Sequence, residues 1–191
     1  MSNTINIRKG LDIRLLGDAA KEIKELSVSK TVSLSPLDFH GLIPKLAVKE
    51  GEKVQVGDVI FYDKKNENIK YVSPASGTVR EIVRGEKRKI LQVLIDSDGK
   101  QTCKKFKVSK VADTSREDLM SLLMDSGLWP CFKQRPLDVV ADPTKEPKGI
   151  YVSSFDSSPL APDYEFILGD RMEQVQVGLK ALNVLCKGKV H

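Results

Sequence analysis

Two short stretches near the middle of the chain alternate apolar and polar residues, and both follow the same local signal. The first occupies residues 46–48 and comes after a Ser-Pro pair at 35–36. The second occupies residues 79–83 and comes after a Ser-Pro pair at 73–74. Alternation with a period of two is typical of half-buried strands, because successive side chains of a strand point to opposite faces. The pattern therefore predicts two similar β-units in tandem.

Each unit ends at a glycine that is followed by Glu-Lys, at Gly51 and Gly85. Glycine accepts the positive φ that tight hairpin turns require, so we expect both to lie in turns with that conformation. Neither unit can bury its apolar face alone, and the two are expected to pack face to face. Residues 35–95 are thus predicted to form a small β-sandwich with a pseudo-twofold axis, in which both Ser-Pro segments are extended.

The flanking residues continue the β pattern. Residues 5–7 and 11–13 are predicted to form a short leading hairpin. After the sandwich, the dipeptide at 98–99 is Asp-Gly, a strong hairpin signal, and predicts a turn into a strand at 106–108. Residues 1–110 are therefore expected to form one β-rich domain.

The pattern changes to a helical one after this point. Thr114 and Glu117 have the spacing of a capping box, which predicts a helix that ends at Gly127. Residues 149–155 are mostly apolar and predict a short buried strand.

A second helix is predicted to begin at Asp170 and to be followed by a strand that starts at Lys189-Val190. Its apolar stripe comprises Met172, Val175, Leu179, Leu182 and Cys186. Helix, strand, helix and strand in succession are typical of α/β domains. Residues 111–191 are therefore predicted to form a truncated, Rossmann-like α/β domain, and the chain is expected to be an engineered fragment.

The composition limits which kinds of functional site the chain can contain. The longest apolar run, 59–62, is far too short to span a bilayer, and the N-terminus has no secretory signal. The three cysteines are far apart and there are two histidines. The odd cysteine count without a signal peptide argues for reduced thiols in the cytoplasm, and the wide spacing argues against zinc or iron–sulfur ligation. No catalytic triad, paired carboxylates or phosphate loop is present, so no catalytic or metal site is predicted.

Positive charge is concentrated in residues 80–110, which hold ten Lys or Arg and four acidic residues, whereas the whole chain carries +5. Within it we predict a docking site made by Arg84, Lys87, Arg88 and Lys89. An acidic protein surface or lipid headgroups would suit it, and the alternative is a solvated strand face. No aromatic pairs interleave with these charges, which argues against nucleic acid.

The sequence of residues 48–60 and 73–79 resembles that of proteins with the biotinyl/lipoyl carrier fold, a barrel-sandwich hybrid. Carrier domains place their modified lysine eight residues before the proline, a position occupied here by Asn66. Lys64 and Lys65 lie close by but outside that spacing. The resemblance implies the carrier fold without its swinging-arm chemistry, and a lipoyl- or biotin-bearing domain is retained as an alternative.

Along its whole length the chain resembles the A subunits of the bacterial Na⁺-translocating NADH:quinone oxidoreductases, specifically their N-terminal part. The matching segments, in order, are 7–12, 48–57, 73–79, 84–88, 126–136 and 155–161. The C subunit of the Rnf electron-transport complex shares this architecture and is the second candidate. Members of the family continue with a β-grasp domain and a helical tail that we expect to be absent here.

The resemblance implies a peripheral component of a respiratory sodium pump, on the cytoplasmic face of the bacterial inner membrane. Such a component docks on the B subunit in the membrane and is associated with quinone (ubiquinone) binding. Flavins and iron–sulfur centres are carried by other subunits. The chain is not expected to be catalytic alone.

Related flavin-binding proteins follow the first helix of the α/β domain with a glycine-rich loop. Here 126–128 is followed by eight residues without a glycine, 129–136. Trp129 and Phe132 would occupy the space that a phosphate needs, so neither flavin mononucleotide nor NADH is expected to bind. Trp129 is interpreted as a core anchor, or alternatively as an aromatic that faces quinone or a partner, with Arg135 beside it.

Overall fold

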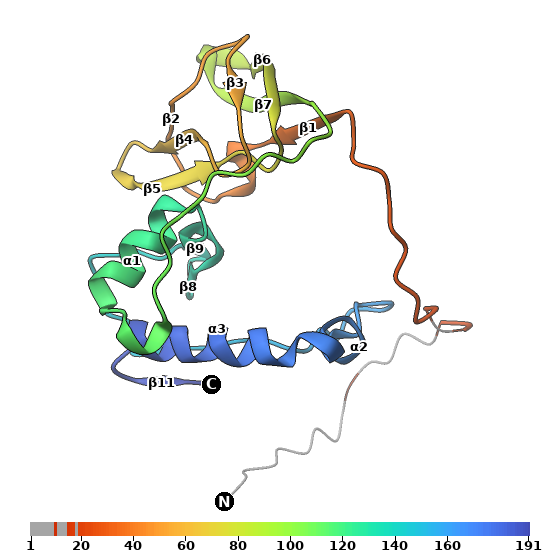
Figure 1. Cartoon of the computed structure of the whole chain (residues 1–191), viewed down its shortest axis with the longest axis vertical. Coiled ribbons are helices and arrows are strands. Elements are labelled where there is room, and N and C mark those ends of the chain that lie inside the picture. Colours follow the sequence, from red (N-terminus) through yellow and green to blue (C-terminus); the bar gives the residue numbers. More distant parts are fainter. Residues whose placement is uncertain (1–9, 11–14, 18) are drawn as a thin grey trace, which may run out of the picture.

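The computed structural model describes residues 10, 15–17 and 19–191. Two layers are visible in Figure 1: a domain of strands lies above, and a domain dominated by helices lies below. The leading hairpin predicted at residues 5–7 and 11–13 lies outside the described residues. No described helix combines the length and the apolar character that crossing a bilayer requires.

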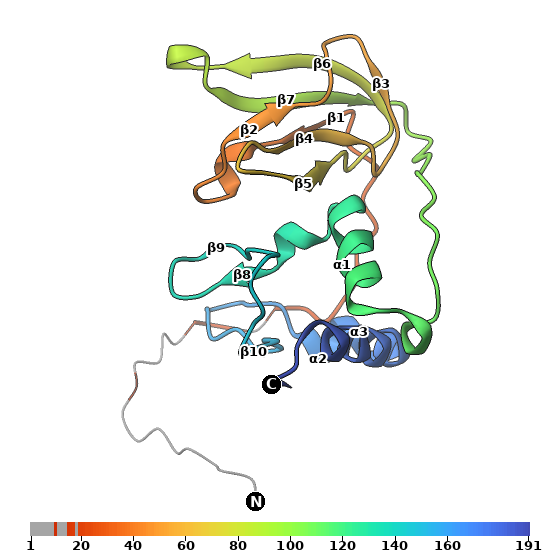
Figure 2. The same ribbon diagram turned by 90° about the vertical axis from the view of Figure 1, so that its left-hand side faces the viewer.

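The upper domain contains two antiparallel sheets. Its four-stranded sheet has the order β1 (Thr31–Leu34), β7 (Ile90–Ser97), β6 (Gly77–Arg84) and β3 (Lys53–Val54). Its three-stranded sheet has the order β2 (Pro44–Leu46), β4 (Val59–Asp63) and β5 (Asn66–Val72). The sheets lie over one another in Figure 2 and share one apolar core. The predicted β-sandwich is confirmed, whereas its pseudo-twofold axis stays a prediction.

The two sequence repeats lead into opposite sheets, but their turns differ. The segment after Ser35 is not extended as predicted, because Pro36–Asp38 form a 3-10 turn (η1) in which the Ser35 hydroxyl accepts the Leu37 N–H. Gly51 has the expected positive φ of 83°. Gly85 does not: its φ is −99°, so this half of the prediction is wrong.

At the second hairpin the positive φ values fall on two residues after the glycine instead. Lys87 and Arg88 have φ of 53° and 61°. A 3-10 turn, η2 (Glu86–Arg88), closes this hairpin, with the Gly85 N–H donating to the Lys89 carbonyl at 2.8 Å.

The Asp98-Gly99 dipeptide makes a turn but no hairpin, which corrects the prediction. The Asp98 carboxylate accepts the Lys100 N–H (2.9 Å) and the Ser76 hydroxyl (2.6 Å). The chain after this turn forms an isolated parallel β-bridge, in which Cys103 pairs with Val56. Residues 106–108 form no strand, and this connection continues through η3 (Val111–Asp113) to the lower domain. The predicted limit at residue 110 falls within it.

The first helix of the lower domain, α1 (Arg116–Asp125), begins one residue later than predicted. Ser115, not Thr114, is the cap: its hydroxyl accepts the Asp118 N–H at 3.1 Å and donates to the Asp118 carboxylate. Thr114 donates instead to the Lys110 carbonyl. Gly127 (φ 73°) terminates the helix from the position just after the Ser126 cap, as predicted.

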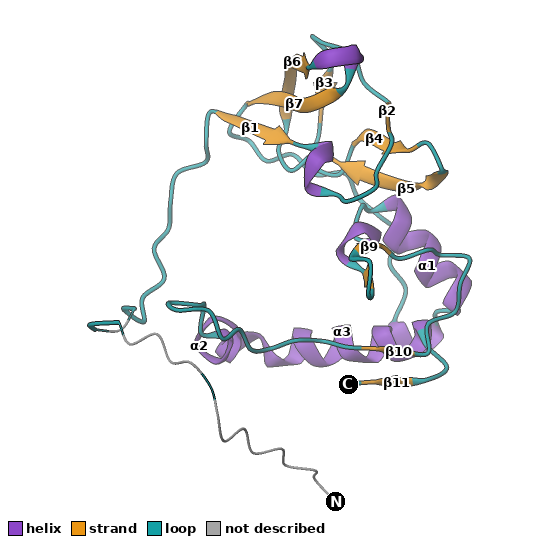
Figure 3. Ribbon diagram, turned by 180° about the vertical axis from the view of Figure 1, so that it is seen from behind, coloured by secondary structure: helices purple, strands orange, loops and turns teal. Residues whose placement is uncertain are grey.

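The rest of the domain is a β-α-β unit with a short hairpin before it. The hairpin pairs β8 (Lys133–Gln134) with β9 (Val139–Val140). Strands β10 (Gly149–Ile150) and β11 (Lys189–Val190) are parallel and are joined through α2 (Tyr164–Leu168), η5 (Gly169–Arg171) and α3 (Met172–Leu185). Figure 3 shows α3 crossing below the sandwich with a long loop beside it.

Two predictions for this unit are wrong. The strand predicted at 149–155 stops after two residues, and Tyr151 and Phe155 are 80% and 78% exposed. Asp170 does not cap α3: the residue at the cap is Arg171, which makes no side-chain cap hydrogen bond, and the chain contains an unpredicted helix, α2, capped by Asp163. The strand predicted at Lys189-Val190 is confirmed.

Candidate site at the domain junction

The segment that follows α1 is where the two domains meet. Hydrogen bonds from Leu128 N to Leu123 O and from Gly127 N to Met124 O close the helix in a Schellman arrangement. A Cβ at Gly127 would lie 2.5 Å from a Val72 methyl carbon. The helix end therefore packs directly on β5, and an ion pair between Lys70 and Asp125 joins the same two elements.

Trp129 opens the next turn, η4 (Trp129–Cys131), and is buried at 7% exposure. Its indole N–H donates to the Ala141 carbonyl at 2.8 Å, and its ring lies 5.3 Å from that of Phe132. This burial agrees with the interpretation of Trp129 as a core anchor. The alternative, an aromatic that faces quinone or a partner, stays a prediction. The backbone of the turn is also satisfied internally, since Cys131 N and Phe132 N donate to Leu128 O and Trp129 O.

A small apolar cavity of about 330 Å³ lies between η4 and the sandwich. Its walls come from both domains, and among the described residues that line it Lys133 is the one with a charged side chain. The lining residues are Leu34, Phe39, Tyr71, Val72, Gly127, Pro130, Cys131 and Lys133. A cavity of this size is at the lower limit of small-molecule sites.

Aromatic rings connect this cavity to the core of the sandwich. Phe39 packs edge-on against Tyr71 at 4.5 Å, and Tyr71 stacks on Phe61 at 5.0 Å. The Lys133 ammonium lies 5.4 Å from the centre of the Phe39 ring. Burial, and secondarily the charge of Asp63, raises the pKa of Tyr71. The cavity thus offers aromatic faces, a neutral phenol and one cation.

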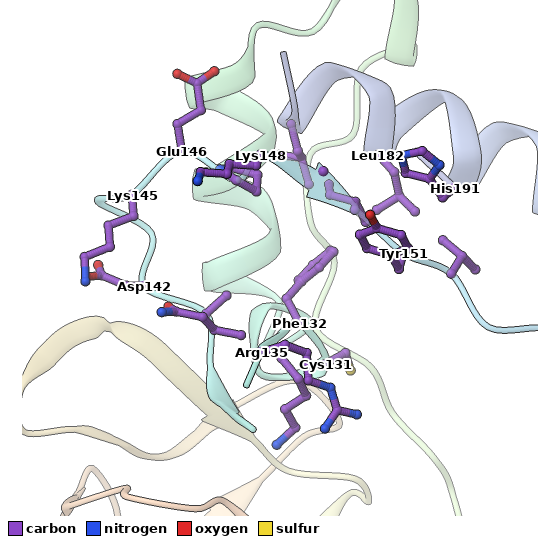
Figure 4. Close-up of a pocket in the computed structure, with 18 of the residues that line it drawn as sticks. Cys131, Phe132, Arg135, Asp142, Lys145, Glu146, Lys148, Tyr151, Leu182 and His191 are labelled. Carbon is purple, nitrogen blue, oxygen red and sulfur yellow. The ribbon is translucent and has the colours of Figure 1, made fainter. Parts of the chain in front are cut away.

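A larger cleft of about 1,210 Å³ adjoins the small cavity, because Cys131 and Lys133 line both. In Figure 4, Arg135 lies at one end of the cleft, Tyr151 and His191 lie at another, and Phe132 lies between them. The last two rings are stacked at 4.7 Å. The Thr144 hydroxyl, followed by its N–H, lowers the pKa of Asp142, which also pairs with Lys145 at 3.6 Å.

The residues singled out by sequence are therefore only partly together. Trp129, Phe132 and Arg135 border the same cleft, and Arg135 is 78% exposed and pairs with Asp138 at 3.3 Å. The predicted docking residues lie away from the cleft, at the tip of the β6–β7 hairpin. The pair Lys64-Lys65 lies in a different hairpin. These two lysines form the turn between β4 and β5, where the Lys65 amine donates to the Gly41 carbonyl at 3.0 Å.

Sequence reasoning missed the half of the small cavity that belongs to the sandwich. Leu34, Phe39 and Tyr71 carry no motif, and each resembles an ordinary core residue of a β-sheet. Their approach to Lys133 depends on how the two domains stack.

Comparison with known proteins identifies both domains. Residues 5–98 match the NqrA N-terminal barrel-sandwich hybrid domain, and residues 114–191 match the NqrA second alpha/beta domain. The A subunit of the Na(+)-translocating NADH-quinone reductase of Saccharophagus degradans is 38% identical over 188 residues, which are 97% of this chain and 42% of that protein. The corresponding protein of a Marinomonas species is 39% identical over 186 residues, and that of Pseudomonas aeruginosa is 36% identical over 185.

Each alignment with the Marinomonas and Pseudomonas proteins covers 96% of this chain and 42% of the relative. The chain thus spans less than half the length of the curated relatives that it matches. The two matched models follow in the predicted order, so the resemblance and the predicted fold classes are confirmed. The chain belongs to the NqrA family, the A subunits of the Na⁺-translocating NADH-quinone reductases.

Proposed function

We propose that this chain is a peripheral component of a Na⁺-translocating NADH-quinone reductase, on the cytoplasmic face of the membrane and docked on the B subunit, and that it binds quinone. The names of its relatives support membership of such a reductase, since they describe one subunit of an NADH-quinone reductase that translocates Na⁺. Translocation requires a membrane and other subunits.

The observation that carries quinone binding is the small cavity at the domain junction. A quinone ring is flat and apolar on both faces and has carbonyl oxygens that accept hydrogen bonds at its edge. Phe39, Tyr71 and Pro130 supply apolar walls, and Lys133 supplies a charged donor. A charge-assisted hydrogen bond from this amine to a carbonyl would fix the orientation of the ring.

Protection of a cysteine from alkylation tests this site. Cys131 and Cys103 are both exposed, but only Cys131 lines the cavity. A short-chain ubiquinone should slow alkylation of Cys131 and leave that of Cys103 unchanged. Equal rates at Cys131 with and without the quinone would contradict the proposal.

Fluorescence gives an independent readout, because Trp129 is the only tryptophan. The same quinone should quench it with saturation. Lys133→Met should weaken the quinone affinity by about 10- to 150-fold, since hydrogen bonds to charged groups contribute about 1.5–3 kcal/mol. Lys49→Met, on the exposed surface of the sandwich, is the charge-matched control and should have no effect.

We further propose that the chain binds neither flavin mononucleotide nor NADH. A phosphate site needs free backbone N–H groups, and those of Leu128, Cys131 and Phe132 are already bonded within the turn, while Pro130 has none. Titration followed by flavin fluorescence checks this. Saturable binding tighter than about millimolar, equivalent to about 4 kcal/mol, would contradict it.

A further inference from the structure

The stretch of positive charge found in the sequence is divided between two places in the fold. Residues 84–89 form the tip of the β6–β7 hairpin, whereas residues 100–110 belong to the connection that descends to α1. Figure 2 places the hairpin tip and this connection on opposite sides of the sandwich. Each must therefore be considered as a separate surface.

The hairpin tip carries four cations and one acid within six residues. The cations are Arg84, Lys87, Arg88 and Lys89, and all are exposed. Within the described part of the chain none of the four forms an ion pair. By contrast, Arg80 nearer the centre of β6 pairs with Asp96 at 3.2 Å, and Lys104 in the connection lies 4.0 Å from Asp58.

The tip is held in one shape by its own hydrogen bonds. Gly85 N donates to Lys89 O at 2.8 Å, Lys89 N donates to Glu86 O at 3.1 Å, and the Arg84 guanidinium donates to Arg88 O at 3.2 Å. Lys87 and Arg88 occupy the left-handed region, which side chains other than Gly and Asn rarely adopt. The cations are thus presented on a preformed turn.

The composition of the tip indicates which surface it fits. Residues 84–89 contain no aromatic or aliphatic side chain. Stable protein interfaces are built around buried aromatic or apolar anchors, and this protruding turn offers none. A lipid bilayer with anionic headgroups needs no such anchor, because basic residues near it are attracted by its surface potential alone.

We propose that the β6–β7 hairpin tip is a docking site for anionic phospholipid headgroups. This inference rests on the proposed place of the chain at a membrane, and it adds the contact that holds the sandwich to the lipid surface. Lys87, Arg88 and Lys89 supply the attraction, and Arg84 both fixes the turn and adds charge.

Co-sedimentation with vesicles tests the proposal on the 191-residue chain. The chain should bind vesicles that contain phosphatidylglycerol and should not bind vesicles of phosphatidylcholine alone. Binding should disappear at about 1 M salt, where the screening length falls to about 3 Å. The triple variant Lys87→Asn, Arg88→Asn, Lys89→Gln should bind about 100-fold more weakly, since each cation contributes about fivefold.

The control removes the same charge from the other surface. This control variant carries Lys105→Gln, Lys107→Gln and Lys110→Gln, three changes in the exposed connection. Together they should change vesicle binding less than about fivefold. Asn tolerates the left-handed conformation, so the tip variant should melt at or above the temperature of the unaltered chain. It should also keep the quinone protection of Cys131, which separates this inference from the proposed quinone site.

Three results would overturn the proposal. The first is that the chain does not bind phosphatidylglycerol vesicles. The second is that both triple variants lose binding equally, which would show a response to net charge alone. The third is that the tip variant binds vesicles normally but no longer co-purifies with the other subunits, which would assign the tip to a protein partner.

Discussion

Five side chains of the sandwich are completely inaccessible to solvent, whereas Leu185, a core residue of the α/β domain, is 4% exposed. The five are Ile60, Phe61, Val79, Val93 and Ile95. In the α/β domain, large apolar side chains between 151 and 179 remain on the surface, among them Phe155 (78%) and Met172 (52%). The apolar side chains of the sandwich are thus buried more completely than those of the α/β domain.

The difference follows from architecture. In the sandwich, each sheet covers the apolar face of the other, so both strand faces that point inward are buried. In the α/β domain, α3 packs on a sheet of only two strands, β10 and β11, and on α1 through a hydrogen bond from Arg116 to Leu185 O at 3.1 Å. Its apolar stripe is buried at Cys186 and exposed at Met172. Only one end of this helix contacts a core.

This comparison predicts that the largest loss of stability comes from a change inside the sandwich. A Cβ at Gly77 would lie 1.9 Å from the Asp96 carbonyl oxygen, in the backbone of the neighbouring strand. Gly77→Ala must push β6 and β7 apart, and we expect it to destabilise the chain by more than about 4 kcal/mol. Urea denaturation followed by circular dichroism measures the change.

A glycine in the other domain is the control. Gly178 lies within α3, and a Cβ there would have nothing within 4 Å. Gly178→Ala should therefore raise stability by up to about 1 kcal/mol. If Gly77→Ala lies within about 1 kcal/mol of the unaltered chain, the close approach of the two strands is wrong.

The next largest effect is expected where the two domains meet. Gly127→Ala places a side chain at φ 73° and against the Val72 methyls, which costs about 1–2 kcal/mol for the conformation and about 1–3 kcal/mol for overpacking. The double variant with Val72→Ala relieves the clash but not the conformation. It should show a coupling that compensates part of the loss, and purely additive values would show that the domains do not touch there.

Signals that act over a few residues predicted much of this fold. The alternation at 46–48 and 79–83 predicted the sandwich, and Gly127 predicted the end of α1, because strand period and a left-handed helix end are local properties. The predictions failed where a contact with a residue far away in the sequence determines the local conformation. Asp98-Gly99 has a hairpin sequence, yet the bond from Ser76 and the pairing of Val56 with Cys103 redirect the chain.

The candidate site shows the same limit more strongly. Trp129, Phe132 and Arg135 were found because they replace a glycine-rich loop in the family resemblance. Phe39 and Tyr71 lie far from these residues in sequence and reach the cavity only because the domains stack. No local pattern encodes that approach, so the sandwich half of the site required the structure.

A smaller effect distinguishes the two possible caps of α1. Ser115→Ala removes the hydroxyl that accepts the Asp118 N–H and should cost about 1 kcal/mol. Thr114→Ala removes only an exposed bond to Lys110 O and should cost less than about 0.5 kcal/mol. Thermal melts of both variants test the pair. The reverse order would restore Thr114 as the cap.

The smallest expected effect is a difference in acid sensitivity between the domains. The Ser76 hydroxyl, then the Lys100 N–H, holds the pKa of Asp98 below its ordinary value. Because the folded-state pKa is the lower one, Asp98 contributes stability that is present above about pH 4 and is lost as the pH falls through the folded value. Asp98→Asn should therefore flatten the dependence of melting temperature on pH below about 4.

Asp142 is the matched residue of the α/β domain, since the Thr144 hydroxyl and N–H lower its pKa in the same way. Asp98 stabilises a turn that is hydrogen-bonded to the buried Ser76, in the domain whose core is fully buried. Asp142 stabilises a loop at the edge of the larger cleft. If the sandwich governs unfolding, Asp98→Asn should change the acid slope more than Asp142→Asn does. Equal slopes would mean that the two domains unfold as one unit despite their unequal cores.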